Sequence, residues 1–374
     1  MRLYLDKLAR YNVRWNVSST TACESMMNLT EAKILRLNAE NFPPTPAEIA
    51  GFERHGITPL QIEGSDVDEM LAHATDADAI LVVSASLPRA LIDQLENCQV
   101  ISRLGAGTDK IDVARATERG ILVTNVPDFC WIEQAEHALA LLLALVRKLP
   151  QMKTSMLAGE WNRARNQCRP IHRLNERTLG LVGFGGSAKE LAKRALGFGL
   201  RVLASRQRMD SEAHAEAQQF QVELVDQDTL LATADYVSLH LPLNDHTYHL
   251  FDAEQLAKIK PGAYFINTAR GAIVDEFALA AALKSGHLAG AGIDTWESIN
   301  VHAEESGAPN HPLLEMENVI FTPHVAAFSQ ESSFAVGDGG VENLATVLQG
   351  YWPPHNRIVN ADVVPRFPLE HGND

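Results

Sequence analysis

Paired cysteines, long apolar runs and an excess of positive charge are all missing from this sequence. Its 374 residues include four cysteines, at positions 23, 98, 130 and 168, with no C-x-x-C pair. That spacing fits neither a disulfide framework nor a zinc site, so we expect a reducing, cytoplasmic location and no bound metal. The longest apolar run, Ala138 to Val146, is far shorter than the roughly 20 residues that span a bilayer, which argues against a membrane protein.

Net charge also narrows the range of partners. The formal charge is −15 at pH 7 and the pI is near 5.4. Such a surface repels the phosphate backbone of nucleic acids and the headgroups of anionic lipids, so neither is an expected partner. An anionic substrate would need positive charge concentrated locally, so basic residues inside motifs become the candidates to bind it.

The length of the chain predicts two domains, and its apolar pattern predicts an α/β fold. Short apolar runs alternate with helical segments, as in parallel sheets whose faces are covered by helices. The runs in the first part are residues 33–37, 79–83, 100–103 and 121–124. After an apolar helix at 132–149, six more follow, at 179–182, 200–204, 236–239, 263–267, 290–293 and 319–322, which predict a six-stranded doubly wound sheet.

These elements suggest a domain plan. Residues 1–32 read as an N-terminal extension without the apolar core of a signal peptide. Residues 33–130 and 325–365 are expected to form one discontinuous substrate-binding domain, and residues 131–324 a dinucleotide-binding Rossmann domain.

A glycine-rich loop follows the first strand of the second domain. It contains Gly183, Gly185, Gly186, Ser187 and Ala188 in the pattern G-x-G-x-x-A, and a helical stretch comes next. The first glycine permits a tight turn, the second lets the backbone approach a pyrophosphate, and the small third residue allows helix and strand to pack closely. The loop therefore predicts a bound dinucleotide, although a glycine-rich turn without any ligand has the same pattern.

The end of the next strand suggests which dinucleotide binds. This strand is followed by Ser205, Arg206 and Arg208, where NAD-binding units usually have an acidic residue for the ribose 2′-hydroxyl. A guanidinium suits the 2′-phosphate of NADP, so NADP is favoured over NAD. The alternative is that both arginines only keep a surface loop soluble.

At this point the sequence resembles the D-isomer-specific 2-hydroxyacid dehydrogenase family, from Lys33 to Asn360. The resemblance rests on R-L-G-A-G-T-D-K-I-D (103–112), V-T-N-V-P (123–127), A-E-H-A-L-A-L (135–141), T-L-G-L-V-G-F-G (178–185), S-L-H-L-P-L (238–243), I-N-T-A-R-G-A-I-V-D-E (266–276), G-A-G-I-D (290–294) and F-T-P-H (321–324). It implies a Rossmann domain beside a smaller, flavodoxin-like substrate domain. It also implies a homodimer and hydride transfer between NAD(P)H and C2 of a small 2-oxo or 2-hydroxy acid.

The resemblance assigns two catalytic residues. The arginine of N-T-A-R-G corresponds to Arg270, which would bind the substrate carboxylate and polarise the keto group. The histidine of T-P-H corresponds to His324, which would exchange the proton with the carbonyl oxygen. Taken alone, His324 could equally be a strand-end histidine that is satisfied by backbone groups.

Further binding residues follow from the same resemblance. Ala106 and Gly107 would offer backbone amides to the substrate carboxylate, and Pro242, Thr268 and Asp294 would line the cofactor pocket. Asp109 and His137 are expected to be structural.

The chain departs from the family pattern at the relay carboxylate that normally orients the histidine. Ile299 occupies its place, so Glu297, or Glu304 and Glu305, would have to reach His324 instead.

Two other departures lie near the glycine loop. Gly186 and Ser187 replace the arginine and isoleucine that are common in the family, and Trp131 stands where a small hydroxyl residue often caps the preceding helix. The missing relay carboxylate keeps a second function class open, in which the fold serves as a nucleotide-sensing binding protein or corepressor with little turnover.

Overall fold

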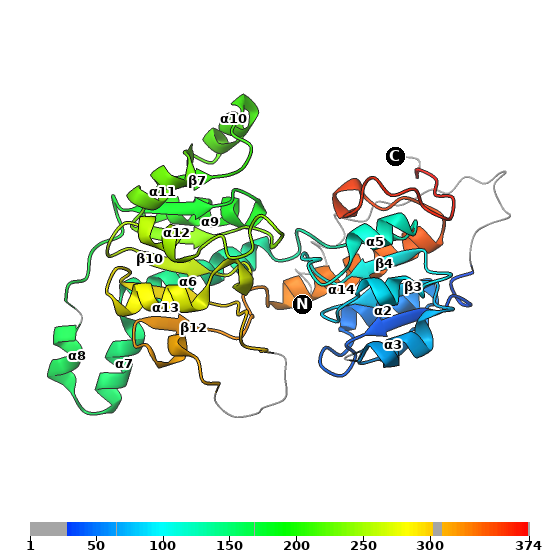
Figure 1. Cartoon of the computed structure of the whole chain (residues 1–374), viewed down its shortest axis with the longest axis horizontal. Coiled ribbons are helices and arrows are strands. Elements are labelled where there is room, and N and C mark those ends of the chain that lie inside the picture. The colour runs from blue at the N-terminus through cyan, green and yellow to red at the C-terminus, as the bar shows by residue number, and fades with distance from the viewer. Residues whose placement is uncertain (1–27, 65, 168, 302–308, 373–374) are drawn as a thin grey trace, which may run out of the picture.

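The computed structural model describes residues 28–64, 66–167, 169–301 and 309–372. Most of the predicted N-terminal extension lies outside the described residues, as do Glu304 and Glu305. The described chain forms two parallel β-sheets, each flanked by helices (Figure 1), which confirms the predicted α/β fold. We call each sheet with its helices the first unit and the second unit.

The sheet of the first unit has five parallel strands in the order β2-β1-β3-β4-β5. This is the flavodoxin-like order, as predicted. The strands are β1 (Ile34–Leu37), β2 (Leu60–Ile62), β3 (Ala79–Val82), β4 (Val100–Arg103) and β5 (Leu122–Thr124). Four of them were predicted, whereas β2 was missed because it is a short edge strand in which Leu60 and Gln61 are exposed.

Helices cover both faces of this first sheet. They are α2 (Pro46–His55), α3 (Val67–Ala74), α4 (Arg89–Ile92), α5 (Val113–Glu118) and the late helix α14 (Gln330–Leu348). Helix α2 begins at a capping box in which Thr45 and Glu48 satisfy each other's backbone amides. Helix α14 returns from the second unit and packs on α2, β3 and β4, and a Cβ on Gly51 would lie 2.9 Å from Val341.

The sheet of the second unit has seven parallel strands, in the order β12-β11-β10-β9-β6-β7-β8. They are β6 (Thr178–Val182), β7 (Arg201–Ser205), β8 (Glu223–Leu224), β9 (Tyr236–Leu239), β10 (Tyr264–Asn267), β11 (Gly290–Ile293) and β12 (Val319–Phe321). The predicted count of six was wrong, because β8 is only two residues long and leaves no apolar run in the sequence. The reversal of strand order at β6 and β9 is the switch point where α/β sheets bind ligands.

The second unit carries its own helices on both faces. They are α6 (Trp131–Val146), α9 (Gly186–Gly197), α10 (Ser211–Gln219), α11 (Gln227–Thr233), α12 (Ala253–Lys258) and α13 (Glu276–Lys284). Short 3-10 turns are η1 (Gly271–Ile273), η2 (Pro312–Glu315) and, in the first unit, η3 (His355–Arg357). Among the described helices, none combines the length and the apolar character that crossing a bilayer requires.

Helix α6 is the apolar helix that the sequence predicted between the two domains. Rather than only linking the units, it packs on α9, β10 and β11 and covers one face of the second sheet. It ends at Val146, earlier than expected, and Lys148 adopts a positive φ of 54°. Beyond that turn, α7 (Leu149–Leu157) and α8 (Trp161–Gln167) form a hairpin that projects from the second unit (Figure 1).

Candidate active site at the carboxyl ends of the strands

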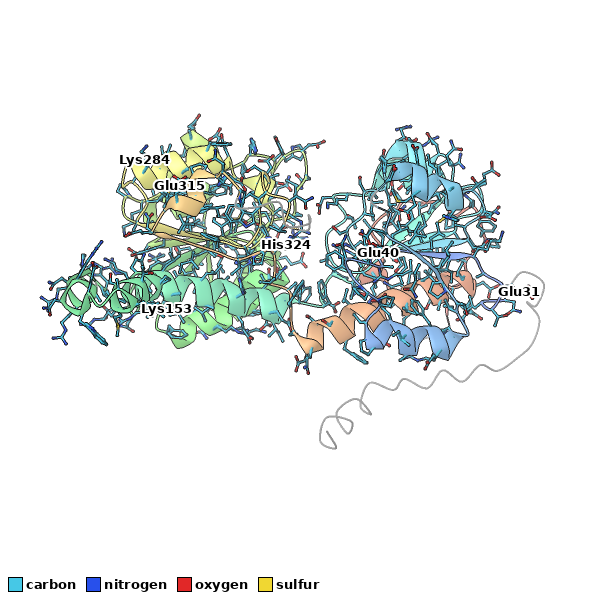
Figure 2. The ribbon with its side chains drawn as sticks, turned by 90° about the horizontal axis from the view of Figure 1, so that it is seen from below. Glu31, Glu40, Lys153, Lys284, Glu315 and His324 are labelled. Atoms are coloured by element: carbon cyan, nitrogen blue, oxygen red, sulfur yellow. The ribbon has the colours of Figure 1, made fainter. Side chains whose placement is uncertain are left out.

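The predicted site residues follow the carboxyl ends of parallel strands, so they gather at one edge of each sheet. Arg270 follows β10, His324 follows β12, and the Ala106–Gly107 turn follows β4 of the first unit. Figure 2 shows His324 on the side of the second unit that faces the first. The two edges therefore face each other across the boundary between the units.

The Arg270 guanidinium crosses this boundary. Its Nε atom donates to Oδ1 of Asp109 at 3.2 Å, and its Nη1 atom donates to the carbonyl of Ala269 at 2.7 Å. A Cβ placed on Gly107 would overlap Nη2 of Arg270, so the guanidinium occupies the space that a side chain at position 107 would need. Arg270 and Gly107, from different units, thus lie against each other.

Asp109 takes part in this contact, although the sequence reading gave it only a structural role. Burial alone would raise the pKa of the Asp109 carboxyl, but the Arg270 charge and hydrogen bond more than offset burial and lower it. In this structure Asp109 is therefore an ionised carboxylate that holds the Arg270 guanidinium in place.

Arg103 adds a second guanidinium that sequence reasoning missed. It is half-buried at the end of β4, donates to the carbonyl of Leu104, and lies so close to Gly105 that a Cβ there would overlap it. Burial, and next the charge of Arg270, lower the pKa of Arg103 to about 10. The sequence held a signal, because Arg103 directly precedes the turn expected to bind a substrate carboxylate, and an anion needs positive charge nearby.

The two amides expected to bind the substrate carboxylate remain available. The carbonyl of Ala106 accepts a hydrogen bond from Asn125 at 2.7 Å. Within the described part of the chain, neither the amide of Ala106 nor that of Gly107 donates to another group. Two arginines, one aspartate and two open amides give the site a net positive charge and donors for an anion.

The turn that carries His324 is fixed by Asp294. The backbone of His324 has a positive φ of 59°, and its amide donates to the Asp294 carbonyl at 2.7 Å. The Asp294 carboxylate is fully buried and accepts from the amides of Val325 and Ala326, both at 2.9 Å, and from the hydroxyl of Thr322 at 2.5 Å. In this structure Asp294 therefore orients the turn that carries His324, and both of its carboxylate oxygens accept hydrogen bonds in doing so.

His137 and Trp296 also contact the turn that carries His324. His137 Nε2 lies 2.9 Å from the Thr322 hydroxyl and 3.5 Å from Oδ1 of Asp294, and the Trp296 indole donates to the carbonyl of Thr322 at 3.2 Å. His137 is thus placed as a supporting residue, which is the role the sequence reading expected.

The carboxylate of Glu297 does not take the position expected for a histidine relay. Its Oε2 atom lies 2.7 Å from Nε2 of His249, whose ring stacks on Tyr248 at 4.1 Å. The hydrogen bond and charge of Glu297 raise the pKa of the Tyr248 hydroxyl. The structure therefore directs Glu297 to His249 and not to His324.

A buried pair, Glu276 and His311, anchors the turn that follows Asp294. Oε2 of Glu276 lies 3.2 Å from Nε2 of His311, and Oε1 accepts from the amide of Glu297 at 2.8 Å. Glu276 also binds both the amide and the hydroxyl of Ser298. A Cβ on Gly271 would overlap the backbone between Trp296 and Glu297, so this turn also rests on the residue next to Arg270.

The glycine loop has the geometry that a dinucleotide needs. Helix α9 begins at Gly186, and its N-cap, Gly185, forms no side-chain cap. Gly183 has a positive φ of 92°, and a Cβ there would overlap the carbonyl of His240, whereas a Cβ on Gly185 would meet no described atom within 4 Å. Ala188 is fully buried, so helix and strand pack closely there. The loop offers unpaired helix amides beside open space, which fits a diphosphate.

Ser187 ties this loop to the end of β9. Its hydroxyl lies 3.0 Å from Nδ1 of His240, and Nε2 of the same ring lies 3.0 Å from the hydroxyl of Ser238. Burial lowers the pKa of His240 to about 4, so the ring is neutral at pH 7 and each nitrogen has a hydroxyl partner.

The arginines expected at the 2′-phosphate position already have partners. Arg206 Nη1 lies 2.6 Å from Glu216, and Lys189 lies 2.5 Å from the same carboxylate. Arg208 pairs with Asp210 at 2.7 Å and also with Glu212. Ser205 ends β7 and is buried. Lys189, on the first turns of α9, is a third cation that the sequence reading did not single out.

Thr268 and Pro242 follow the neighbouring strand ends. Thr268 is buried directly after β10, and the carbonyl of Pro242, beyond β9, accepts from Thr247 at 2.7 Å. Both lie at the same sheet edge as the glycine loop.

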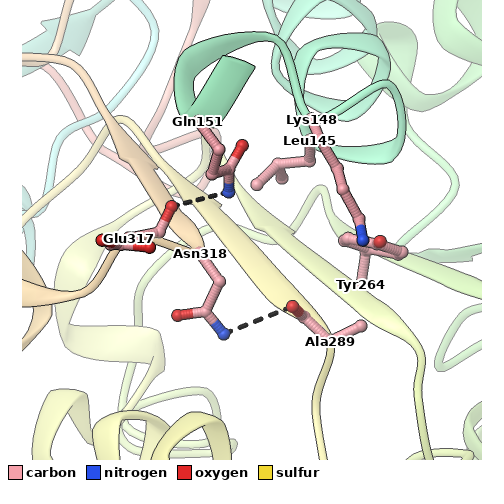
Figure 3. A pocket seen from close by; sticks show the side chains of 7 residues that line it. All are labelled: Leu145, Lys148, Gln151, Tyr264, Ala289, Glu317 and Asn318. Atoms are coloured by element: carbon pink, nitrogen blue, oxygen red, sulfur yellow. Dashed lines mark hydrogen bonds between the residues drawn. The ribbon is translucent and has the colours of Figure 1, made fainter. Parts of the chain in front are cut away.

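A separate surface pocket lies at the opposite edge of the second sheet (Figure 3). It is lined by Leu145, Lys148, Gln151, Tyr264, Ala289, Glu317 and Asn318. Tyr264 begins β10, and Ala289 and Asn318 immediately precede β11 and β12. The pocket is therefore at the amino ends of the strands, away from the predicted site.

Comparisons with known proteins complete the description of the site. The model of the "D-isomer specific 2-hydroxyacid dehydrogenase, NAD binding domain" matches residues 139–326. A glyoxylate reductase of Thermococcus litoralis is 35% identical over 304 residues, 80% of this chain and 88% of that protein. A D-3-phosphoglycerate dehydrogenase of Methanocaldococcus jannaschii is 36% identical over 308 residues, 82% of this chain but only 56% of that longer protein.

Solved structures give the same result. An NADPH-dependent glyoxylate/hydroxypyruvate reductase of Sinorhizobium meliloti, in complex with NADP and malonate, has a TM-score of 0.74 and 28% identity, covering 90% of this chain and 99% of that one. An NAD-dependent formate dehydrogenase of Staphylococcus aureus, in complex with NAD, has a TM-score of 0.74 and 26% identity, covering 87% and 98%. The comparisons support a nicotinamide cofactor without separating NADP from NAD.

Proposed function

We propose that this chain reduces a small 2-oxo acid with NADPH. It belongs to the D-isomer specific 2-hydroxyacid dehydrogenase family and is thus an NAD(P)-dependent oxidoreductase of 2-oxo or 2-hydroxy acids. The predicted family and enzyme class are confirmed. Two relatives are named glyoxylate reductases, and a third is named for glyoxylate and hydroxypyruvate, which supports a substrate of that size.

The meeting of Arg270 with Gly107 is the observation that carries the proposed chemistry. A 2-oxo acid has a carboxylate next to its ketone, and a fixed guanidinium can pair with the first while it polarises the second. The amides of Ala106 and Gly107 reach the carboxylate from the other unit. Closure of the units on the substrate excludes water and strengthens these contacts.

His324 donates the proton that the reduced keto oxygen needs. The nicotinamide, when bound, supplies the hydride to C2, and the imidazolium protonates the oxygen as charge develops on it. Asp294 acts through the backbone of the turn, because it binds the amides of Val325 and Ala326, which directly follow His324. We retain Pro242, Thr268 and Asp294 as residues of the cofactor pocket, and Gly183, Gly185, Gly186, Ser187 and Ala188 as its diphosphate loop.

NADPH is the proposed coenzyme because Arg206, which follows β7, lies close to Lys189 on the first turn of α9. Both bind Glu216, so a 2′-phosphate would replace a carboxylate that already has two cations. Hydrogen bonds from Lys189 and Arg206 lower the pKa of Glu216, which keeps its carboxylate charged at neutral pH.

A homodimer in the cytoplasm completes the proposal. The projecting α7–α8 hairpin exposes Leu149, Leu157 and Trp161, of which Leu157 is 79% and Trp161 65% exposed. Large apolar side chains in such a cluster favour burial against a second copy.

Residues 33–130 and 325–365 form the substrate domain in this proposal, and residues 131–324 form the cofactor domain.

The experiment is a panel of initial rates. The purified chain is mixed with glyoxylate, hydroxypyruvate, pyruvate or a longer 2-oxo acid, each with NADPH and with NADH. We expect cofactor oxidation with the smallest acids and a higher kcat/KM with NADPH. Tight NADPH binding with no turnover on any acid would instead assign the chain to a nucleotide sensor or corepressor.

A further inference from the structure

The glycine loop of this chain is covered by a tryptophan from another helix. Trp131 is the first residue of α6, which packs along α9. A Cβ built on Gly186 would overlap Cδ2 and Cε2 of Trp131, the two atoms of the fused bond of the indole. The ring therefore lies directly on the backbone of Gly186, and a residue with a side chain at this position would force the ring away.

The indole also has a free polar group at this place. Trp131 is 40% exposed, and among the described residues its Nε1–H donates to no acceptor. Gly186 is the first residue of α9, where amides without intrahelical partners attract anions. An aromatic ring with an N–H donor thus borders the proposed diphosphate position.

The neighbouring residue shows that the loop is held from two sides. Ser187 binds His240 at 3.0 Å, beyond the end of β9, while Trp131 lies on Gly186 from α6. Gly186 and Ser187 are the two positions at which the loop departs from the common family pattern, and each of them contacts a residue outside the loop. The loop is therefore restrained in spite of its adjacent glycines at 185 and 186.

We propose that Trp131 is a further cofactor-binding residue, whose indole forms a wall of the diphosphate subsite and whose Nε1–H donates to a phosphate oxygen. This inference rests on the proposed function, because it requires a dinucleotide at the glycine loop. Trp131 and Gly186 act as a matched pair: the glycine leaves room for the ring, and the ring supplies the contact that the loop itself lacks.

Equilibrium binding tests the proposal. NADPH binding is followed by nicotinamide fluorescence excited directly, and ADP-ribose, which lacks nicotinamide, is measured by competition. Trp131→Phe keeps an aromatic ring but loses the N–H donor, so it should raise the Kd of both ligands by about tenfold, as loss of a hydrogen bond to a charged group would. Trp131→Ala also loses the wall, so its Kd for both ligands should rise further, by about 30-fold. Phe198→Ala, which removes an exposed ring at the far end of α9, is the control and should bind as the wild type does.

A double-mutant cycle distinguishes the loss of the indole's contact with the ligand from a general loss of stability. Gly186→Ala should weaken binding in the wild type, because the new methyl displaces the indole, and should have no further effect in Trp131→Ala. Unchanged Kd values in both Trp131 variants, or additive effects of the two substitutions, would overturn the proposal. If Trp131→Ala does not fold, Trp131→Phe still decides. Failure of the wild type to bind either NADPH or NADH would refute the proposed function instead.

Discussion

The guanidinium of Arg270 lies in the space above Gly107, where any side chain would collide with it. One residue comes from the turn after β10 in the second unit, and the other from the turn after β4 in the first. This contact, supported by Asp109 at 3.2 Å, brings the two halves of the proposed substrate site together.

Gly107→Ala should displace Arg270 and lower kcat/KM for the 2-oxo acid by about 100-fold, a loss typical of a misplaced binding group. The Kd for NADPH should stay unchanged, because Gly107 belongs to the first unit whereas the glycine loop follows β6 in the second. Gly197→Ala makes the same change where a Cβ meets no described atom within 4 Å, so it should retain full activity. Wild-type kinetics in Gly107→Ala would show that Arg270 does not depend on this space.

Arg103 should give the enzyme an alkaline limit. Its pKa is lowered to about 10, so it is protonated below that pH and loses its charge as the pH rises through it. The positive charge that attracts an anionic substrate then falls, and KM for the acid should rise between about pH 9 and 11. Arg103→Met should have a high KM at all pH values. An equal alkaline rise in this variant would assign the effect to another group.

The buried Glu276–His311 pair should matter for stability. Glu276→Ala removes the acceptor of the Glu297 and Ser298 amides and leaves the buried His311 ring without its partner, and loss of a buried partner costs about 1–3 kcal/mol. Urea denaturation should therefore show a clear loss of unfolding free energy. Glu254→Ala, at a side chain that is 80% exposed, should change it little. Equal stability of the two variants would contradict the anchoring role.

Coenzyme preference should respond to Arg206 and Glu216 in opposite directions. Arg206→Ala should raise the KM for NADPH by at least about tenfold and leave that for NADH nearly unchanged, because only NADPH has the 2′-phosphate. Glu216→Gln should lower the KM for NADPH, since it frees Arg206 and Lys189 from a competing carboxylate. Arg208→Ala is the comparison, because its partners Asp210 and Glu212 are separate from this cluster. A preference for NADPH that survives Arg206→Ala would contradict the assignment.

Much of the architecture could be predicted because local sequence patterns determine its strands and helices. Apolar runs marked the buried strands, and the glycine loop marked the start of α9. The two strands that were missed, β2 and β8, are short edge strands with exposed residues, so burial leaves no periodic signal in them. Helix α6 was expected to run to residue 149, but the chain turns at Lys148, where nothing in the sequence requires a positive φ.

Individual partners at the site were harder to predict than its location. Arg270 and Gly107 could be brought together by motif, whereas the pairing of Glu297 with His249 depends on how two distant turns pack. The same is true of Arg103, which becomes a site residue only because β4 directs it toward Arg270, and of Trp131, which reaches Gly186 only because α6 lies along α9. Contacts of this kind come from tertiary packing and have no fixed spacing in the sequence.

The initial rate of NADPH oxidation with glyoxylate, in the wild type and in His324→Ala, is the most direct test of the proposed chemistry. Removal of the proton donor should lower kcat by about 100-fold or more, while the Kd for NADPH stays the same. If His324→Ala turns over at the wild-type rate, the imidazole after β12 is not the proton donor and the mechanism is wrong.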